Sequence, residues 1–569
     1  MGFKTAFLSA ILTPCLAFCS TQAEAARARM IRDLDFIHNT FSVMYAPAEW
    51  KERYADWNLA REIELAKERV QTMDDVSLKG FQRVVRQFVQ STKDYHVGVQ
   101  FWSTEFATLP FRVCGSQGKY FITAIDRARL SSRSFSFQEG DELVLFDGRP
   151  TDEVVQELKK VEVGDSSPNT DQAVAEIYLT SRAGASGLIV PRGPVQISVR
   201  SATTGVVSSY QICWDYFRER IKEPSLAKLD EEEAYSEPKK VGEHRFLHKK
   251  MTTPLINTVL KNSFASAGDP NGLGARESFV PDLGTKIWSG PEDSPFEAYI
   301  FKSPSGRKVG YIRIPIYDGG AVEVEEFGHL IAHLEANTDA LVLDQVNNPG
   351  GSVFYLYGLA SHLTQTPLHT PKHRMAITQE EVYWALFYEQ YFELVQSDDD
   401  ARALIGDTIE GSPVSYQTAQ FILNYYRFII DEWNDGRMLT QPYYLFGVDW
   451  INPNPGARYT KPILLLANRL CFSGGDFLPA IMQDNERVTV FGTRTAGAGG
   501  YVETFSYHNP FGVASISYTA SLAERIDSNP IENLGVTPDI CYELTQEDFQ
   551  TGYAPYKQAV LEALEGILD

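Results

Sequence analysis

The chain has 569 residues, 43% of them hydrophobic and 22% charged. This composition supports a large buried core and excludes collagen-like, coiled-coil and wholly disordered proteins. Lys and Arg total 52 against 74 Asp and Glu, for a net charge of −22, so the chain lacks the basic excess with which proteins bind nucleic acids or anionic membranes. At about 100–200 residues per domain, the length predicts about three to five structural units.

Residues 1–25 have the three-part pattern of a secretory signal peptide. Lys4 precedes a mostly apolar stretch over residues 6–18, and Ala23-Glu24-Ala25 follows as a small-x-small cleavage site. We therefore predict cleavage after Ala25 and a secreted mature chain. No later run approaches the roughly 20 apolar residues of a transmembrane helix, so no integral membrane segment is expected.

Residues 26–105 are predicted to form an N-terminal helical region. Apolar residues recur at helical spacing over 59–70 and 81–88. Over residues 94–99, Asp-Tyr-His-Val-Gly-Val changes the period to two, which predicts a strand.

Residues 106–215 are predicted to form a compact β-rich unit. A strand over 140–146 runs into an Asp-Gly turn, a helix follows over 151–161, and a hairpin joins residues 195–200 to 208–214. The stretch Gly-Asp-x-Leu-x-x-x-Asp-Gly followed by a helix resembles the carboxylate-side half of a PDZ domain. The alternative is a β-hairpin without a ligand groove.

Residues 216–275 are predicted to be a charged linker. Charged residues dominate 219–252 and apolar anchors are few, which is typical of an exposed segment with nothing to bury. The functional alternative is a processing or regulatory segment.

Residues 276–569 are predicted to form an α/β core. Strands are expected over 309–316, 340–344, 462–467 and 488–491, and helices over 322–334, 353–364 and 474–482. Strands and helices that alternate with short turns are typical of this fold class.

Two glycine-rich turns in this core could carry chemistry. Asn347-Asn-Pro-Gly-Gly follows one strand, and Ser473-Gly-Gly-Asp follows another and opens a helix. A nucleophilic serine needs such a turn, because attack on a carbonyl places negative charge on oxygen. Backbone N–H donors can stabilise that charge, each by about 3–4 kcal/mol in the transition state. The alternative is that Ser473 only caps the helix.

Two further motifs of the core are Gly-Thr-Arg-Thr-Ala-Gly-Ala-Gly-Gly over residues 492–500 and Glu-Asn-Leu-Gly-Val-Thr-Pro-Asp over residues 532–539. Together with the two turns, their order and spacing resemble the C-terminal processing and tricorn-type serine peptidases across essentially the whole mature chain. The resemblance implies a crotonase-like α/β catalytic core with an N-terminal helical region and an inserted PDZ-like domain. The motifs that carry it lie at residues 45–47, 50–52, 94–99, 347–353, 371–375, 492–500 and 531–536.

The resemblance also implies the site residues. Many members use a lysine about 25 residues after the serine, but Ala498 matches that position and no lysine lies between Lys461 and Lys557. A histidine is then the suitable base, and the motif comparison implies His96. Glu532 matches the family's catalytic glutamate. The implied oxyanion donors are the N–H groups of Gly351 and Gly474, with Gly350 as the alternative to the first.

Neither a metal nor another cofactor is expected. His329 and His333 share a helical face, but the glutamate of an H-E-x-x-H site is missing and no third ligand stands out. Activity should rise with pH near about 6–7, where an ordinary histidine becomes neutral.

The sequence thus predicts a serine endopeptidase that acts on proteins or peptides through an acyl-enzyme. The resemblance implies homodimerisation, self-cleavage within about residues 220–275, and action on host proteins by an intracellular bacterium. Two alternatives remain: a catalytically silent, PDZ-bearing binding protein, and an enzyme that trims only C-terminal tails after its PDZ-like unit captures the carboxylate.

Overall fold

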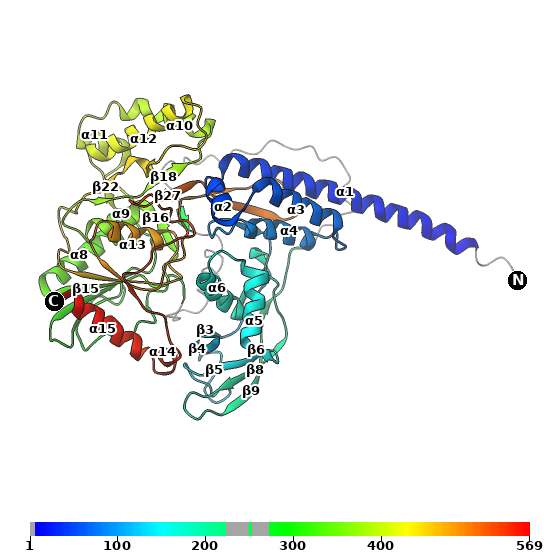
Figure 1. Cartoon of the computed structure of the whole chain (residues 1–569), viewed down its shortest axis with the longest axis horizontal. Coiled ribbons are helices and arrows are strands. Elements are labelled where there is room, and N and C mark those ends of the chain that lie inside the picture. Colours follow the sequence, from blue (N-terminus) through cyan, green and yellow to red (C-terminus); the bar gives the residue numbers. More distant parts are fainter. Residues whose placement is uncertain (1–5, 223–249, 253–271, 569) are drawn as a thin grey trace.

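A seven-stranded sheet organises the C-terminal half of the molecule (Figure 1). The computed structural model describes residues 6–222, 250–252 and 272–568. The first three strands run antiparallel and the strands from the third onward run parallel. Their order is β12 (Lys286–Ser289), β13 (Ala298–Lys302), β14 (Lys308–Arg313), β15 (Ala340–Asp344), β23 (Ile463–Ala467), β24 (Thr489–Gly492) and β28 (Ile540–Cys541).

The two faces of this sheet belong to different hydrophobic cores, because successive side chains of a strand point to opposite sides. Leu341 and Leu343 of β15 join a core with α8 (Ala321–Asn337), α9 (Val353–Ser361) and α13 (Gly474–Asp484). Ala340 and Val342 join a second core with α15 (Ala554–Leu568). The predicted α/β core is confirmed, although α9 ends at Ser361, before the predicted residue 364.

Four helices lead into the molecule from the N-terminus: α1 (Ala6–Met44), α2 (Ala48–Ala55), α3 (Leu59–Thr72) and α4 (Leu78–Ser91). Figure 1 shows the first part of α1 projecting away from the body. Among the side chains described in α1, Ala26 is the first to be buried, and Met30, Leu34, Ile37 and Phe41 continue the buried stripe at helical spacing.

The prediction of a strand from residue 94 is wrong for its first half. Residues 94–97 form a turn, and β1 (Gly98–Phe101) starts only at Gly98. Asp94 accepts a hydrogen bond from the backbone N–H of His96 (2.8 Å), which is the local bond by which aspartate favours turns over strands. β1 then pairs with β26 (Val513–Thr519), which also pairs with β25 (Val502–Phe505).

The PDZ-like unit has a core of its own. Its sheet runs β3 (Phe111–Ser116), β4 (Lys119–Ile125), β5 (Glu142–Phe146), β8 (Pro194–Arg200) and β9 (Val207–Cys213), with β6 (Arg149–Pro150) beside β5. Two helices, α5 (Thr151–Leu158) and α6 (Pro168–Thr180), accompany the sheet. A smaller sheet joins β10 (Asp215–Phe217), β2 (Phe106–Thr108) and β7 (Ser181–Ala183).

A group of three helices was not predicted: α10 (Gln379–Phe392), α11 (Asp398–Ile405) and α12 (Tyr416–Asn434). Three small sheets accompany these helices. One pairs β17 (Leu368–His369) with β22 (Trp450–Ile451), and another pairs β19 (Thr408–Ile409) with β20 (Ser412–Pro413). The third has the order β21 (Tyr443–Tyr444), β18 (Lys372–Met375) and β27 (Ser521–Glu524). Within the described ranges, no helix is both long and apolar enough to cross a membrane.

Most of the predicted charged linker lies outside the described residues. The described part includes a three-residue strand, β11 (Lys250–Thr252), which pairs antiparallel with β16 (Gly350–Ser352). Residues 250–252 of the predicted linker therefore pair with the glycine turn that follows β15.

Candidate active site

Ser473 lies where the loop after β23 enters α13. Its backbone has φ 54° and ψ −114°, a conformation that non-glycine residues rarely adopt and that marks strain. Its carbonyl oxygen accepts the N–H groups of Asp476 (2.7 Å) and Phe477 (2.8 Å). The hydroxyl makes no capping hydrogen bond to α13, so the alternative of Ser473 as a side-chain cap does not describe this turn.

The second glycine turn lies directly against the serine turn. A Cβ atom added to Gly474 would come within 3.2 Å of Gly350 Cα, and one added to Gly351 would come within 2.0 Å of Tyr317 O. Gly351 also has φ +150°, so both conformation and space require glycine there. The N–H of Gly350 already donates to Asn348 Oδ1 (2.8 Å), which leaves Gly351 as the better candidate for an oxyanion donor.

His96 is fully buried in the turn before β1. Its carbonyl oxygen accepts Ser517 Oγ (2.7 Å), and its N–H donates to Asp94, so the backbone is held on both sides. Among the described residues, neither ring nitrogen of His96 nor the Oγ of Ser473 has a hydrogen-bond partner. Burial lowers the pKa of His96 to about 4. The nearby Asp94 carboxylate raises this pKa, and the Lys51 cation lowers it further.

Glu532 is fully buried between β27 and β28. Its Oε2 accepts the N–H of Gly499 (2.9 Å), and its Oε1 accepts the ammonium of Lys51. Burial, followed by the Asp94 carboxylate, raises the pKa of Glu532 to about 8, while Lys51 acts in the opposite direction.

These side chains converge from distant parts of the sequence. One ligand atom each of Asp94, His96 and Glu532 lies within 4.8 Å of the others. Tyr95 and Phe472, the residues just before His96 and Ser473, pack edge to face with ring centroids 5.4 Å apart. The structure thus brings His96 and Glu532 together and sets the loops of His96 and Ser473 side by side.

Asp476 connects the serine turn to the loop that reaches Glu532. Its two carboxylate oxygens accept the N–H groups of Gly497 (2.8 Å) and Ala498 (3.0 Å). Ala498, the position where many family members carry lysine, is therefore held by its backbone.

Asp94, His96 and Glu532 could in principle hold a cation, but their oxygens are already bonded to the protein. Asp94 accepts Tyr45 Oη (2.9 Å), Thr519 Oγ1 (2.8 Å) and the His96 N–H. Glu532 accepts Lys51 and Gly499. A metal ion would have to displace the Lys51 ammonium, so the donor set fits an organic cation rather than a metal.

Two residues of the site were not identified from the sequence. Asp94 and Lys51 both lie in motifs that carried the family resemblance, but the sequence suggested no role for either. The available signal was the presence of charged residues inside those motifs, since their contacts with residues near position 530 depend on the tertiary structure.

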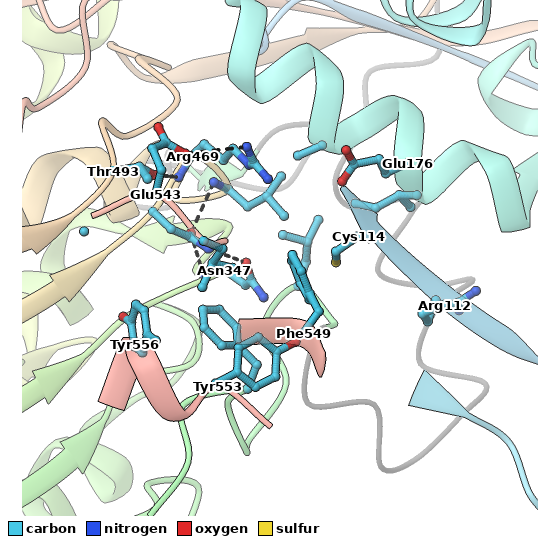
Figure 2. Close-up of a pocket in the computed structure, with 18 of the residues that line it drawn as sticks. Arg112, Cys114, Glu176, Asn347, Arg469, Thr493, Glu543, Phe549, Tyr553 and Tyr556 are labelled. Carbon is cyan, nitrogen blue, oxygen red and sulfur yellow. Dashed lines mark hydrogen bonds and ion pairs between the residues drawn. The ribbon is translucent and has the colours of Figure 1, made fainter. Parts of the chain in front are cut away.

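A cavity of about 80 Å³ lies where the PDZ-like unit meets the catalytic core. Figure 2 shows Cys114 and Glu176 on the side of β3 and α6, across the cavity from Arg469 and Phe549. Ser116 Oγ donates to Leu544 O (2.7 Å), and Thr170 Oγ1 donates to Arg469 O (3.0 Å). The edge strand and helix of the PDZ-like unit therefore face the core.

Two segments of the chain match known protein families. Residues 308–542 match the model of peptidase family S41, and residues 105–221 match that of a PDZ domain. A protein of Chlamydia muridarum is 36% identical over 95% of this chain and 93% of its own length, and one of Chlamydia trachomatis is 34% identical over 93% and 91%.

Solved structures of CPAF, the chlamydial protease-like activity factor, are similar throughout. Mature CPAF is 32% identical with a TM-score of 0.82, covering 96% of this chain and 98% of that chain. CPAF complexed with lactacystin gives a TM-score of 0.81 at the same identity, covering 96% and 99%.

Proposed function

This chain belongs to peptidase family S41 and is a serine peptidase, and we propose that it is an exported endopeptidase with Ser473 as nucleophile, His96 as base and Glu532 as the carboxylate that orients the base. The observation that carries the proposal is the strained turn of Ser473 at the start of α13, where Gly474 packs against Gly350 of the second glycine turn. A nucleophilic hydroxyl and backbone donors for an oxyanion are thereby in one place.

The proposed chemistry is acyl transfer. Ser473 Oγ attacks the peptide carbonyl carbon while His96 takes its proton, and the N–H groups of Gly351 and Gly474 stabilise the resulting oxyanion. His96 then returns the proton to the leaving amine, which yields the acyl-enzyme. Water attacks the ester with His96 again as base. Glu532 stabilises the imidazolium formed in each half of the reaction.

Several contacts favour an endopeptidase over a tail-trimming enzyme. A carboxyl-terminal tail captured by the PDZ-like unit would bind along β3 and α6, and both face the core. In contrast, β16 already pairs with an extended segment of the chain, β11. An internal stretch of substrate could add to the same backbone groups.

We extend the proposal to self-activation. Because β11 pairs with the turn that carries Gly350 and Gly351, residues 250–252 occupy the backbone that a substrate strand would use. Cleavage within residues 220–275 would release this segment. A relative of this chain has been solved in a mature form, which supports a maturation step.

Secretion, homodimerisation and host protein substrates are also proposed. The first rests on the signal-peptide pattern of residues 1–25, and the other two rest on similarity to chlamydial proteins.

The activity is tested by digesting two substrates with the processed protein: a denatured protein, and a folded protein with an unstructured C-terminal tail. Internal fragments of the denatured substrate are expected from the wild type and none from a folded Ser473→Ala variant, because loss of a nucleophile costs many orders of magnitude in rate. Loss of the tail alone, with the denatured substrate left intact, would contradict the endopeptidase proposal and favour tail trimming.

A further inference from the structure

Helix α2 contains one buried residue, and that residue is a lysine. Of its eight residues, all of which the structure describes, only Lys51 is buried, with none of its surface exposed. Burying an ammonium group is costly unless every proton is donated to an acceptor. A short helix with no other buried residue therefore places a cation inside the protein, and this cation needs a specific partner.

The partners of Lys51 are all found at the candidate active site. Its Nζ donates to Glu532 Oε1, to Asn533 Oδ1 (2.7 Å) and to the carbonyl oxygen of Lys93 (2.8 Å). These three bonds use all three protons of the ammonium. No lone pair remains to accept a proton from Ser473, so this geometry does not make Lys51 the missing lysine base.

Glu532 needs such a cation because of what else faces it. A carboxylate oxygen of Asp94 and a ring nitrogen of His96 both lie within 4.8 Å of a Glu532 oxygen. The buried Tyr45 hydroxyl is also close, and the charge of Glu532 raises the pKa of Tyr45. Asp94 draws its own hydrogen bonds from Tyr45, Thr519 and the His96 backbone. Two carboxylates this close in a dry site cannot both ionise readily unless a positive charge compensates one of them.

We propose that Lys51 is a positioning residue of the catalytic site: its ammonium stabilises the ionised form of the Glu532 carboxylate and holds that carboxylate beside His96. This inference rests on the proposed triad, because it assigns Lys51 a role through Glu532. The base lysine that many family members carry after the serine is absent here, and this lysine comes from the N-terminal helical region to act on the carboxylate instead.

The proposal makes a directional statement about pH. Burial and Asp94 already raise the pKa of Glu532, and Lys51 opposes them. Removing Lys51 leaves the hydrogen bond from the Gly499 N–H to oppose burial and Asp94, so Glu532 should stay protonated to higher pH. The acid limb of the activity profile should then move toward alkaline pH, and the lost activity should return in part as pH rises.

The experiment compares Lys51→Met with wild type and with the matched control Lys67→Met. Each protein is expressed as the full chain and assayed after maturation. Lys67 is also a helical lysine with two acidic partners, Asp35 and Glu64, but lies 21% exposed on α3. The values of kcat and KM for a peptide substrate are measured between about pH 5 and 10.

Lys51→Met should move the acid limb of kcat up by at least about one pH unit, which lowers the rate at least about tenfold below the limb, with KM little changed. Lys67→Met should keep the wild-type limb. A folded Lys51→Met variant with the wild-type limb would overturn the proposal, whatever its absolute rate.

A second measurement covers the case in which Lys51→Met is too unstable to assay. Urea unfolding of wild type, Lys51→Met, Glu532→Gln and the double variant forms a double-mutant cycle. Lys51→Met should lower the unfolding midpoint strongly when Glu532 is present and much less in the Glu532→Gln background. Equal losses in both backgrounds would refute the pairing. The cycle needs no activity, so an inactive wild type would refute the triad alone.

Discussion

At the scale of single residues, burial determines the chemistry of the site. A histidine on a surface is neutral only above about pH 6–7, and the sequence alone suggested that range for His96. In the structure, His96 is enclosed and its pKa falls to about 4. Glu532 is enclosed as well and its pKa rises to about 8. Both shifts disfavour charge, because each group loses its hydration when buried.

The first prediction concerns the pH dependence of kcat/KM. A working triad needs a neutral imidazole, present above about pH 4, and an ionised Glu532, which accumulates as pH rises through about 8. Because the two groups interact, they titrate as a pair. Activity should therefore rise between about pH 4 and 8 and level off above it. The profile is measured with a peptide whose own ionisation lies outside this range.

A lysine base would give a different profile. Its ordinary pKa near 10.4 would delay the rise in activity to above about pH 9. A rise confined to that range, or a His96→Ala variant with near-normal activity, would contradict the assignment of His96.

At the scale of structural elements, a turn of the PDZ-like unit holds two catalytic loops. Asp171 of α6 accepts the hydroxyl of Tyr95 (2.6 Å), the residue next to His96, and also the N–H groups of Ser166 (2.8 Å) and Ser167 (3.0 Å). Arg494 completes the connection: it donates to Ser167 Oγ (2.7 Å) and to the carbonyl oxygen of Asn533 (3.1 Å), just after Glu532. The start of α6 is thus bonded toward both His96 and Glu532.

The second prediction tests this connection with Tyr95→Phe. Loss of the hydroxyl leaves Asp171 buried with one donor fewer, which should cost about 1–3 kcal/mol of stability. It should also lower kcat about tenfold with little change in KM, because small displacements of catalytic groups slow the chemical step. Thermal unfolding and steady-state kinetics provide the two measurements.

Tyr216→Phe is the matched control, since Tyr216 also donates to a carboxylate, that of Glu105 (2.8 Å), but lies on β10. This variant should keep the wild-type kcat. If Tyr95→Phe and Tyr216→Phe had equal kinetics, the connection between α6 and the catalytic loops would have no functional meaning.

At the scale of the whole molecule, local sequence patterns explain what could be predicted from the sequence. The continuous apolar run of β15 and the glycine-flanked Ser473 turn are local features, and both were located from sequence. The pairing of Lys51 with Glu532 joins residues 481 positions apart, so no local pattern reports it. Helix α10 was missed for another reason: its apolar residues Tyr383, Leu386 and Tyr391 are 61%, 53% and 43% exposed, so they mark no single buried face.

The two halves of the chain depend on each other. Strand β1, next to His96, pairs with β26, and Met30 and Leu34 of α1 share one core with Leu465 of β23. A cut within residues 220–275 would leave these contacts intact.

The third prediction follows for maturation. Wild type should convert to two fragments that elute together on gel filtration, whereas purified Ser473→Ala should remain a single chain. Adding processed wild type to Ser473→Ala should then produce the same two fragments. Equal cleavage of Ser473→Ala in a preparation free of other proteases would contradict self-processing, and separation of the fragments would contradict the shared core.

Labelling with a fluorophosphonate tests the central claim, the nucleophilic role of Ser473, most directly, because the reagent forms a covalent bond only with an activated serine. Processed wild type is treated with and without lactacystin, the compound seen bound to CPAF, and the modified peptide is identified by mass spectrometry. We predict one modified residue, Ser473, with labelling lost in Ser473→Ala, strongly slowed in His96→Ala and reduced by lactacystin. Equal labelling of wild type and Ser473→Ala, or modification of another serine in its place, would contradict the account.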